Sequence, residues 1–245
     1  MEVLNAVYEV DFLGFSYGFR PGRSPHRALD ALTVGLRSRK VNWVLDADIR
    51  GFFDTIDHEW MQKFLQHRIG DQRLVRLIGK WLKAGVMESD QWQPSEDGTP
   101  QGAVISPLLG NVYLHYALDL WVQQWRKRHA RGEVIVVRYA DDFVVMCPTA
   151  QGCEEAQGRI EHVLGRLGLK LHPQKTRRVV LTEGREGFDF LGCHLHKRMS
   201  GRLWQQKGLR RYYLQRWPSA KAMGRVRERV RQLTPRWRCH EDVRG

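Results

Sequence analysis

The chain has 245 residues and a formal net charge of +13 at neutral pH. Its four cysteines show no Cys-x-x-Cys spacing and no matching histidine array, which argues against a zinc site or a disulfide scaffold. No signal peptide and no apolar stretch long enough to cross a bilayer is present, so we expect no membrane association and a reducing setting, either cytoplasmic in a bacterium or organellar.

The positive charge is concentrated at the end of the chain. Residues 197–245 contain 15 Lys or Arg against 3 Asp or Glu, whereas residues 1–196 contain 25 against 24. Aromatic residues that would suit stacking lie among these charges: Trp204, Tyr212, Tyr213, Trp217 and Trp237. A solvated basic helix is the ordinary alternative, but the acids that normally balance such a helix are missing. This pattern predicts a nucleic-acid-binding segment after a nearly neutral body.

The first half of the chain predicts helices around one buried strand. A helix is expected from Ser24 to Ser38, with Ser24 as its cap and Pro25 in its first position. The following strand carries Asp46 and Asp48, which lie two residues apart and would point to one face. Periodicity leaves open which of them is a metal ligand. Further elements are expected over about residues 57–69, 71–84 and 104–129 as helices, and over 88–99 as a polar loop or short hairpin.

In the second half, Asp141 and Asp142 stand side by side between two runs of β-branched apolar residues. Each run predicts a buried strand, and the break between them predicts a tight connection. A solvent-facing Asp-Asp turn is the simple alternative. Arg138 alone cannot neutralise two buried carboxylates, whereas divalent ions such as Mg²⁺ prefer carboxylate oxygens. With one upstream aspartate, the pair would be a sufficient ligand set for two catalytic metal ions.

The remaining elements complete an α+β pattern. A helix is expected over about residues 151–167 and two short strands over Thr176–Leu181 and Phe188–His196. A break near Lys197–Arg216 would precede an arginine-rich helix, Ser219–Leu233. Strands that share a sheet with helices packed on one side form an α+β domain.

Five sequence blocks occur together in one order: Ser16–Ser24 (SYGFRPGRS), Asp48–His58 (DIRGFFDTIDH), Gly98–Asn111 (GTPQGAVISPLLGN), Tyr139–Asp142 (YADD) and Phe188–Gly192 (FDFLG). In this detail the chain resembles the bacterial and organellar group II intron reverse transcriptases, also called maturases. The resemblance implies a polymerase palm, an antiparallel sheet with helices on one face, with partial fingers and the start of a helical thumb. The implied domains are residues 1–45 as residual fingers and palm entry, 46–196 as palm, and 197–245 as basic linker and start of the thumb (maturase) domain. Both ends fall short of the family's pattern, so we expect the missing fingers and thumb to come from the rest of a longer chain or from another chain.

The resemblance also implies the site residues. The catalytic residues would be Asp48, Asp141, Asp142 and Lys175. Two Mg²⁺ ions, with Mn²⁺ as a substitute, would be held by Asp48, Ile49, Asp141 and Asp142. The nucleotide would be contacted by Phe53, Gln101 and Gly102, and nucleic acid by Arg20, Arg23 and Tyr139. Independently of the resemblance, the basic charge and the one-turn spacing of the last helix predict nucleic-acid contacts by Arg225, Arg227, Arg229 and Arg231. Asp46 receives no role.

Several of these residues have a simpler reading from the sequence alone. Phe53 would lie beneath the sugar and exclude a 2′-hydroxyl, yet either Phe52 or Phe53 could be a core residue. Lys175 would steady the departing pyrophosphate, or it could be a solvated surface lysine. Asp57 is better explained as a helix cap than as a ligand.

The resemblance implies an RNA-directed DNA polymerase that extends a DNA or RNA primer with deoxynucleoside triphosphates on an RNA template, intron RNA above all, and that assists splicing. A non-catalytic RNA-binding maturase fragment or an inactive remnant is the alternative from another class. Reverse transcriptases of CRISPR-linked, retron and diversity-generating elements share the core blocks and remain open.

Overall fold

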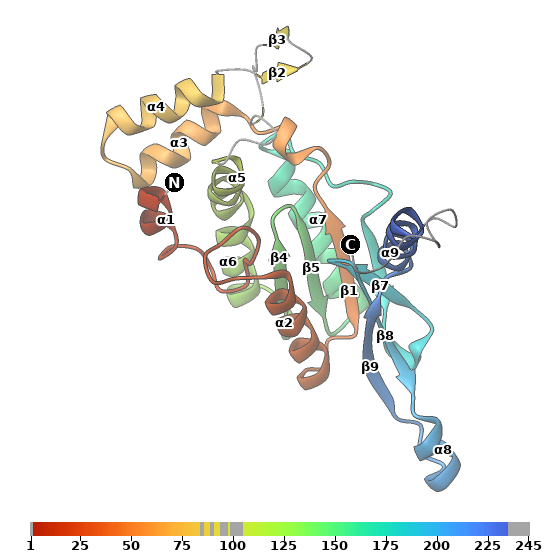
Figure 1. Cartoon of the computed structure of the whole chain (residues 1–245). Helices are drawn as coiled ribbons and strands as arrows, with labels where there is room; N and C mark the ends of the chain where they lie inside the picture. Colours follow the sequence, from red (N-terminus) through yellow and green to blue (C-terminus); the bar gives the residue numbers. More distant parts are fainter. Residues whose placement is uncertain (1, 84–85, 89–90, 94–97, 99–104, 235–245) are drawn as a thin grey trace. The chain divides into compact units, whose positions relative to one another are not determined.

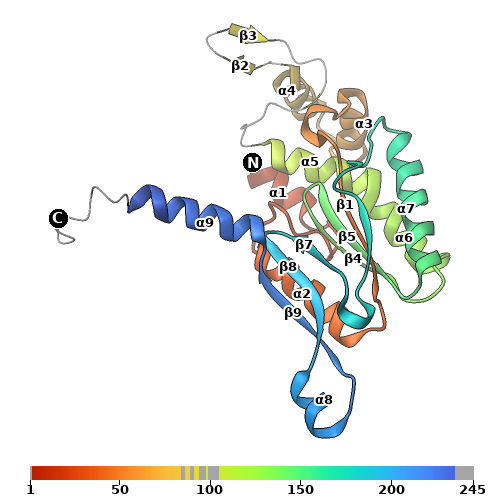
Figure 2. The same cartoon turned by 90° about the vertical axis from the view of Figure 1, so that its right-hand side faces the viewer.

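The structure is a computed structural model that describes residues 2–83, 86–88, 91–93, 98 and 105–234 (Figures 1 and 2). It divides into two compact units, Met1–Val179 and Val180–Gly245. Antiparallel sheets and helices occur in both units, which confirms the predicted α+β class. The predicted domain boundaries after residues 45 and 196 stay predictions.

The first unit is built mainly of helices around one sheet. Its helices are α1 (Glu2–Tyr8), α2 (Pro25–Ser38), α3 (His58–Arg68), α4 (Gln72–Lys83), α5 (Ser106–Leu114), α6 (Leu120–Arg128) and α7 (Ala150–Gly165). Its strands are β1 (Trp43–Asp48), β2 (Val86–Glu88), β3 (Gln91–Gln93), β4 (Ile135–Tyr139), β5 (Asp142–Cys147) and β6 (Arg177–Val180). Four of them form a sheet in the order β4-β5-β1-β6, and β2 pairs with β3 in a separate hairpin.

The two faces of the four-stranded sheet are covered by different helices. Alternate residues such as Leu45, Phe143 and Val145 belong to the main core, which also contains apolar residues of α5, α6 and α7. The residues between them point the other way, where Gly35 of α2 lies close to Ile135 and Met146. The expectation of helices on one face is therefore refined, because α2 covers part of the opposite face near β4 (Figure 1).

Two helices begin at the capping residues that the sequence predicted, Ser24 and Asp57. The Ser24 hydroxyl accepts a hydrogen bond from the Arg27 backbone N–H at 3.3 Å, and Asp57 accepts one from Trp60 at 2.8 Å. Each cap satisfies a backbone donor that a helix start leaves unpaired. Ser24 and Asp57 are thus structural residues, as predicted.

The long helix predicted over residues 104–129 is interrupted. Residues His115–Asp119 form a π-helical turn between α5 and α6. Such a turn accommodates extra residues in a helix and changes the direction of the side chains that follow. Here it carries Asp119, which is fully buried.

In the second unit, two predictions from the sequence were wrong. Phe188–His196 is a hairpin of β7 (Gly187–Phe190) and β8 (Cys193–Met199) rather than one strand, because Leu191 (φ 48°) and Gly192 (φ 78°) form a turn with positive φ at both positions. The predicted break at Lys197–Arg216 is instead occupied by the end of β8, α8 (Gly201–Lys207) and most of β9 (Tyr212–Pro218). The arginine-rich helix α9 (Ala220–Leu233) follows, capped by Ser219. Among all described residues, no helix has the length and apolarity needed to cross a membrane.

Candidate active site

Three aspartates meet at one end of the four-stranded sheet. The register of β1 and β5 places Asp48 directly opposite Asp142. Asp141 lies in the turn between β4 and β5, and its carbonyl accepts a hydrogen bond from the Ile49 backbone N–H at 3.3 Å. Directly opposed residues of antiparallel strands lie roughly 4.5–5.5 Å apart at Cα. Strand pairing therefore brings Asp48 close to two aspartates that lie more than ninety positions later in the sequence.

The carboxylates of this group repel one another. Burial, followed by the charges of Asp46, Asp48 and Asp141, raises the pKa of Asp142 to about 8. Burial is also the main cause that raises the pKa of Asp141. A carboxyl group with a raised pKa lacks the positive neighbours that its ionised form needs. The site therefore carries more negative charge than its own residues compensate.

Two cations nevertheless reach this group from the segment after α7. Lys175 Nζ donates to Asp48 Oδ2 at 2.7 Å, and Arg177 Nε donates to Asp46 Oδ2 at 3.2 Å. The segment is held beside β1 because the His172 backbone N–H donates to the Asp48 carbonyl at 2.8 Å. Asp46, to which the sequence assigned no role, is thus an ion-pair partner of Arg177. Arg177 was not predicted, since its partner lies far away in the sequence.

The donor set has the chemistry of a site for a hard divalent cation. Carboxylate oxygens are the ligands that Mg²⁺ prefers, and a divalent charge would offset the burial and the carboxylate repulsion that together raise the pKa of Asp142. In the described parts of the chain, however, no group of three His, Cys, Asp or Glu side chains is already arranged to hold a metal ion. Metal binding by Asp48, Ile49, Asp141 and Asp142 stays a prediction that their chemistry supports.

The turn between β4 and β5 has an unusual backbone. Ala140 has a φ of 56°, which is uncommon for a residue with a side chain. Gly18 packs directly against this turn, since a Cβ on Gly18 would lie 2.3 Å from the Ala140 nitrogen. The adjacent backbone also pairs with β4, because the Arg138 N–H donates to the Phe15 carbonyl at 2.8 Å. The surroundings thus fix the turn that presents Asp141.

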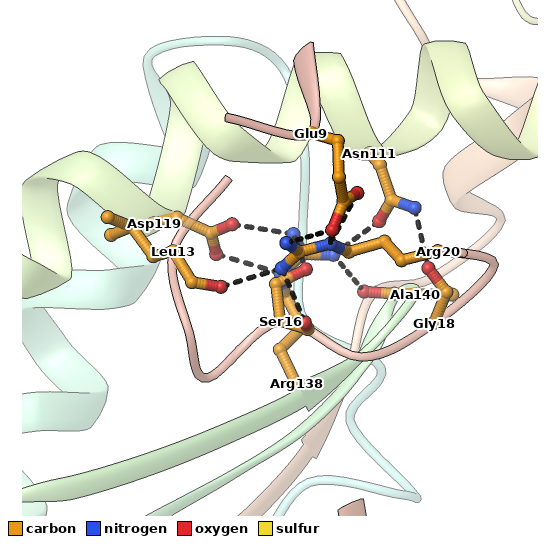
Figure 3. Close-up of polar contacts among 9 residues, drawn as sticks. All are labelled: Glu9, Leu13, Ser16, Gly18, Arg20, Asn111, Asp119, Arg138 and Ala140. Carbon is orange, nitrogen blue, oxygen red and sulfur yellow. Dashed lines mark hydrogen bonds and ion pairs between the residues drawn. The ribbon is translucent and has the colours of Figure 1, made fainter. Parts of the chain in front are cut away.

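Arg138 ties this turn to α5 and to the π-helical turn that follows α5 (Figure 3). Its guanidinium is fully buried and donates to the two carboxylate oxygens of Asp119 at 2.7 and 2.6 Å. It also donates to the Ala140 carbonyl at 2.8 Å, to Asn111 Oδ1 at 3.1 Å and to the Ser16 hydroxyl at 2.8 Å. Arg138 is therefore already paired with Asp119, which sequence reasoning missed because the π-helical turn could not be foreseen.

The predicted nucleotide-contacting residues are only partly described. Phe52 is 2% exposed and belongs to the core, whereas Phe53 is half-buried beside it, with ring centroids 5.2 Å apart. The backbone of Phe53 also packs against Gly98, where a Cβ would lie 2.7 Å from the Phe53 carbonyl oxygen. Gln101 and Gly102 lie outside the described residues.

The predicted nucleic-acid contacts of the first unit differ in accessibility. Arg20 is 6% exposed and donates to Glu9 and to the carbonyls of Leu13 and Ser16, so its guanidinium is used within the protein. Arg23 stacks over the Tyr17 ring at 5.0 Å. Tyr139 is half-buried, with its ring 6.0 Å from that of Phe19.

The four arginines of α9 are all exposed: Arg225, Arg227, Arg229 and Arg231. Arg231 approaches Glu228 at 3.8 Å across a solvent-exposed pair. An exposed pair of this kind contributes little to stability, so both side chains remain accessible to a ligand.

Solved structures identify the fold. The structure of apo telomerase from Candida tropicalis truncated from its C-terminal domain superposes with a TM-score of 0.61 at 12% identity, covering 80% of this chain and 42% of that chain. A telomerase from Candida albicans in complex with a fragment of telomeric RNA superposes with a TM-score of 0.60 at 13% identity, covering 79% and 36%. The chain thus has the α+β fold that these telomerase structures contain over the matched region.

Comparison with known sequences shows the family to which the chain belongs. The family model "Reverse transcriptase (RNA-dependent DNA polymerase)" matches residues 2–195, and the chain belongs to this family. Protein YkfC of Escherichia coli is 32% identical over 232 residues, covering 80% of this chain and 59% of that protein. The group II intron-encoded protein LtrA of Lactococcus lactis is 41% identical over 129 residues, covering 53% and 21%. The chain thus spans 59% and 21% of the lengths of these relatives.

The raised pKa of Asp142 has a measurable consequence for stability. Without divalent metal, the folded protein binds this proton more tightly than the unfolded chain, so stability from this group is full below about pH 4 and is lost as the pH rises towards about 8. Asp142→Asn should stabilise the metal-free protein at neutral pH by about 1 kcal/mol or more and flatten the decline. Urea unfolding in EDTA across this pH range measures both effects. Glu161→Gln, on the exposed face of α7, should leave the wild-type pH profile unchanged.

Proposed function

We propose that this chain is the palm of a group II intron-type reverse transcriptase, which adds deoxynucleotides to a primer 3′ end on an RNA template. The observation that carries the proposal is the register that sets Asp48 opposite Asp142, with Asp141 in the adjoining turn. Three carboxylates next to a polyanionic substrate have no use in a simple RNA-binding module, because they would repel phosphate. Two bound divalent cations would supply the activation of the primer hydroxyl and the stabilisation of the leaving group.

The protein's own residues have distinct tasks in this proposal. Asp48, Asp141 and Asp142 would supply carboxylate oxygen ligands to the cations, and the backbone carbonyl of Ile49 would supply another. Lys175, which pairs with Asp48, would supply positive charge to the departing pyrophosphate. Arg177 keeps Asp46 out of the ligand set by pairing with it.

The match to LtrA and to intron proteins favours the group II type over other reverse transcriptases. A protein encoded in the cob intron of Schizosaccharomyces pombe is 42% identical over 121 residues, covering 49% of this chain and 15% of that protein. We infer that intron RNA is the template and that the chain acts in a bacterial cell or an organelle, as LtrA and the intron proteins suggest by their names and organisms.

Primer extension tests the proposal directly. The chain is incubated with an RNA template, an annealed DNA primer, deoxynucleoside triphosphates and Mg²⁺, and parallel reactions contain Mn²⁺ or EDTA. Metal-dependent extension on RNA is expected. RNA binding without extension under either metal would favour the alternative, a non-catalytic maturase fragment.

Phe53 is proposed to select the sugar of the incoming nucleotide. Phe53→Ala should raise ribonucleotide incorporation relative to deoxynucleotide incorporation, because removing the ring makes room for a 2′-hydroxyl. Single-nucleotide extension with matched dNTP and rNTP measures the ratio. Phe52→Leu is the control: it perturbs the neighbouring core ring and should change stability more than discrimination. If a folded Phe53→Ala protein discriminates between deoxynucleotides and ribonucleotides as the wild type does, Phe53 contributes to packing and not to sugar selection.

The arginines of α9 are proposed to track RNA phosphates. Arg225 and Arg229 lie one turn apart, as do Arg227 and Arg231. Reversing all four charges should weaken RNA binding and flatten its salt dependence, because each lost phosphate contact removes about 0.7–0.9 from the log–log slope. We expect about 4–8 phosphate contacts for the whole basic tail.

Charge reversal is a cleaner test than truncation, because a cut after His196 would divide β8. Filter binding to RNA at several salt concentrations gives the slope. Arginine-to-lysine substitution at the same positions keeps the charge and should keep the slope. An unchanged salt dependence of RNA binding after charge reversal would mean that the α9 arginines face solvent and do not contact RNA.

A further inference from the structure

The three-stranded sheet of the second unit has one buried face and one open face. Alternate residues of β7, β8 and β9 point to opposite sides, and Phe188, Leu195 and Leu214 on one side are at most 5% exposed. On the other side, Trp217 is 54% exposed and Tyr213 is 47% exposed. Large aromatic side chains are thus presented to solvent on a sheet that already has its core.

The strand register arranges the open face into a row. Trp217 lies opposite His194, Gln215 opposite His196, and Tyr213 opposite Arg198. Directly opposed residues of antiparallel strands share a face and lie in contact range. We define the open face by these residues: His194, His196, Arg198, Tyr213, Gln215 and Trp217.

Hydrogen bonds and ring contacts hold part of this row in place. The Trp217 indole N–H donates to Gln215 Oε1 at 3.2 Å, which fixes the ring along the strand. His194 Nδ1 contacts Asp189 Oδ1 at 2.6 Å, and the rings of His194 and His196 are 5.2 Å apart. A surface that is ordered before binding loses less conformational entropy when a ligand arrives.

The charge around the open face specifies the kind of ligand. Between Asp189 and Glu228 the sequence has no acidic residue and ten basic ones: Lys197, Arg198, Arg202, Lys207, Arg210, Arg211, Arg216, Lys221, Arg225 and Arg227. By register, Arg198 lies on the open face, whereas Lys197 and Arg216 lie on the opposite side of the sheet. Asp189 lies on the same face opposite His194, and its carboxylate is engaged by the His194 ring. Exposed aromatic rings in a strongly basic surrounding are the features with which proteins bind single-stranded nucleic acid.

We propose that the open face binds single-stranded nucleic acid, with bases stacked on Trp217 and Tyr213 and a phosphate on Arg198. The two aromatic residues lie four positions apart in β9, so they can receive bases that are separated along the strand. The choice of nucleic acid as ligand rests on the proposed function. The binding itself requires neither metal nor catalysis.

The neighbouring residues Tyr212 and Tyr213 show why the sequence could not locate this face. Both were predicted as stacking residues, but β9 turns only Tyr213 to the open side, whereas Tyr212 pairs with Met199 on the other side. Trp204 lies in α8 and stacks with Arg210 at 5.3 Å, away from the row. The register, rather than composition, selects Tyr213 and Trp217.

Fluorescence anisotropy with a labelled single-stranded RNA of about twelve nucleotides tests the proposal in EDTA. Trp217→Ala and Tyr213→Ala should each weaken binding about tenfold, while the salt slope stays at its wild-type value because no charge is lost. Arg198→Gln should instead make the slope shallower by about one contact. Trp217→Phe keeps a ring and should retain most of the affinity.

Trp81→Ala is the matched control, since Trp81 is an exposed tryptophan of α4 with 43% exposure. It should bind RNA as the wild type does, and thermal melting should show that all variants fold. Wild-type affinity in a folded Trp217→Ala, Tyr213→Ala double variant would overturn the proposal. The binding assay contains no nucleoside triphosphate and no metal. Weakened RNA binding by these variants would therefore support the proposal even if the protein failed to extend a primer.

Discussion

Asp141→Asn should abolish primer extension while leaving the protein folded and able to bind RNA. The substitution keeps the size of the side chain but removes one of the charged oxygens on which binding of a divalent cation depends. It also removes a negative charge near the expected path of the RNA phosphates. RNA affinity should therefore be unchanged or stronger, by about fivefold at most. Extension on an RNA template and filter binding, measured on one preparation, give both values.

The control for this experiment is Glu161→Gln, which neutralises an exposed carboxylate of α7 away from the aspartates. It should extend the primer at the wild-type rate. Residual extension by Asp141→Asn comparable to that of Glu161→Gln would remove Asp141 from the catalytic group. A parallel loss of RNA binding would mean that Asp141 supports the fold and not the chemistry.

Arg138→Met should destabilise the protein by about 3–5 kcal/mol, because it leaves the carboxylate of Asp119 buried without a partner. For a chain of this length, such a loss lowers the melting temperature by roughly 10 °C or more. The substitution also removes the donor to the Ala140 carbonyl, which helps to fix the turn before Asp141. Thermal and urea unfolding measure the change.

A double variant separates the two effects of Arg138. Arg138→Met with Asp119→Leu removes both members of the buried pair and should recover much of the lost stability. It does not restore the bond to Ala140, so extension should remain low. Arg159→Met breaks an exposed ion pair with Glu155 and should cost less than about 0.5 kcal/mol. A loss below about 1 kcal/mol for Arg138→Met would contradict the role of the buried pair.

Local patterns in the sequence were sufficient for most elements of the fold. The caps at Ser24 and Asp57 depend on side chains that bond their own neighbouring backbone, and both were predicted correctly. The hairpin around Asp141 was predictable because two β-branched runs flank a polar break. These features depend on interactions between residues close in the chain.

What the sequence could not predict depends on residues far apart in the chain. Asp119 meets Arg138 only because the helix changes its winding at the π turn, and Arg177 meets Asp46 only because β6 pairs with β1. The turn at Leu191 was missed because a leucine rarely adopts positive φ, so the sequence reads as a continuous strand. Tertiary context decided each of these cases.

The π turn at His115–Asp119 also limits how this sequence can change in length. Asn111 before the turn and Asp119 at its end both hold Arg138, so they must lie on one side of the helix. At about 100° per residue, the eight steps between them would place them about 80° apart in a regular α-helix, and the wider π turn takes up this rotation. Deletion of one residue in the turn would leave seven steps and about 20° of separation in a regular helix, so both partners would still face Arg138. Insertion of one more residue would instead rotate Asp119 away by about 100° and separate two partners of the same buried cation.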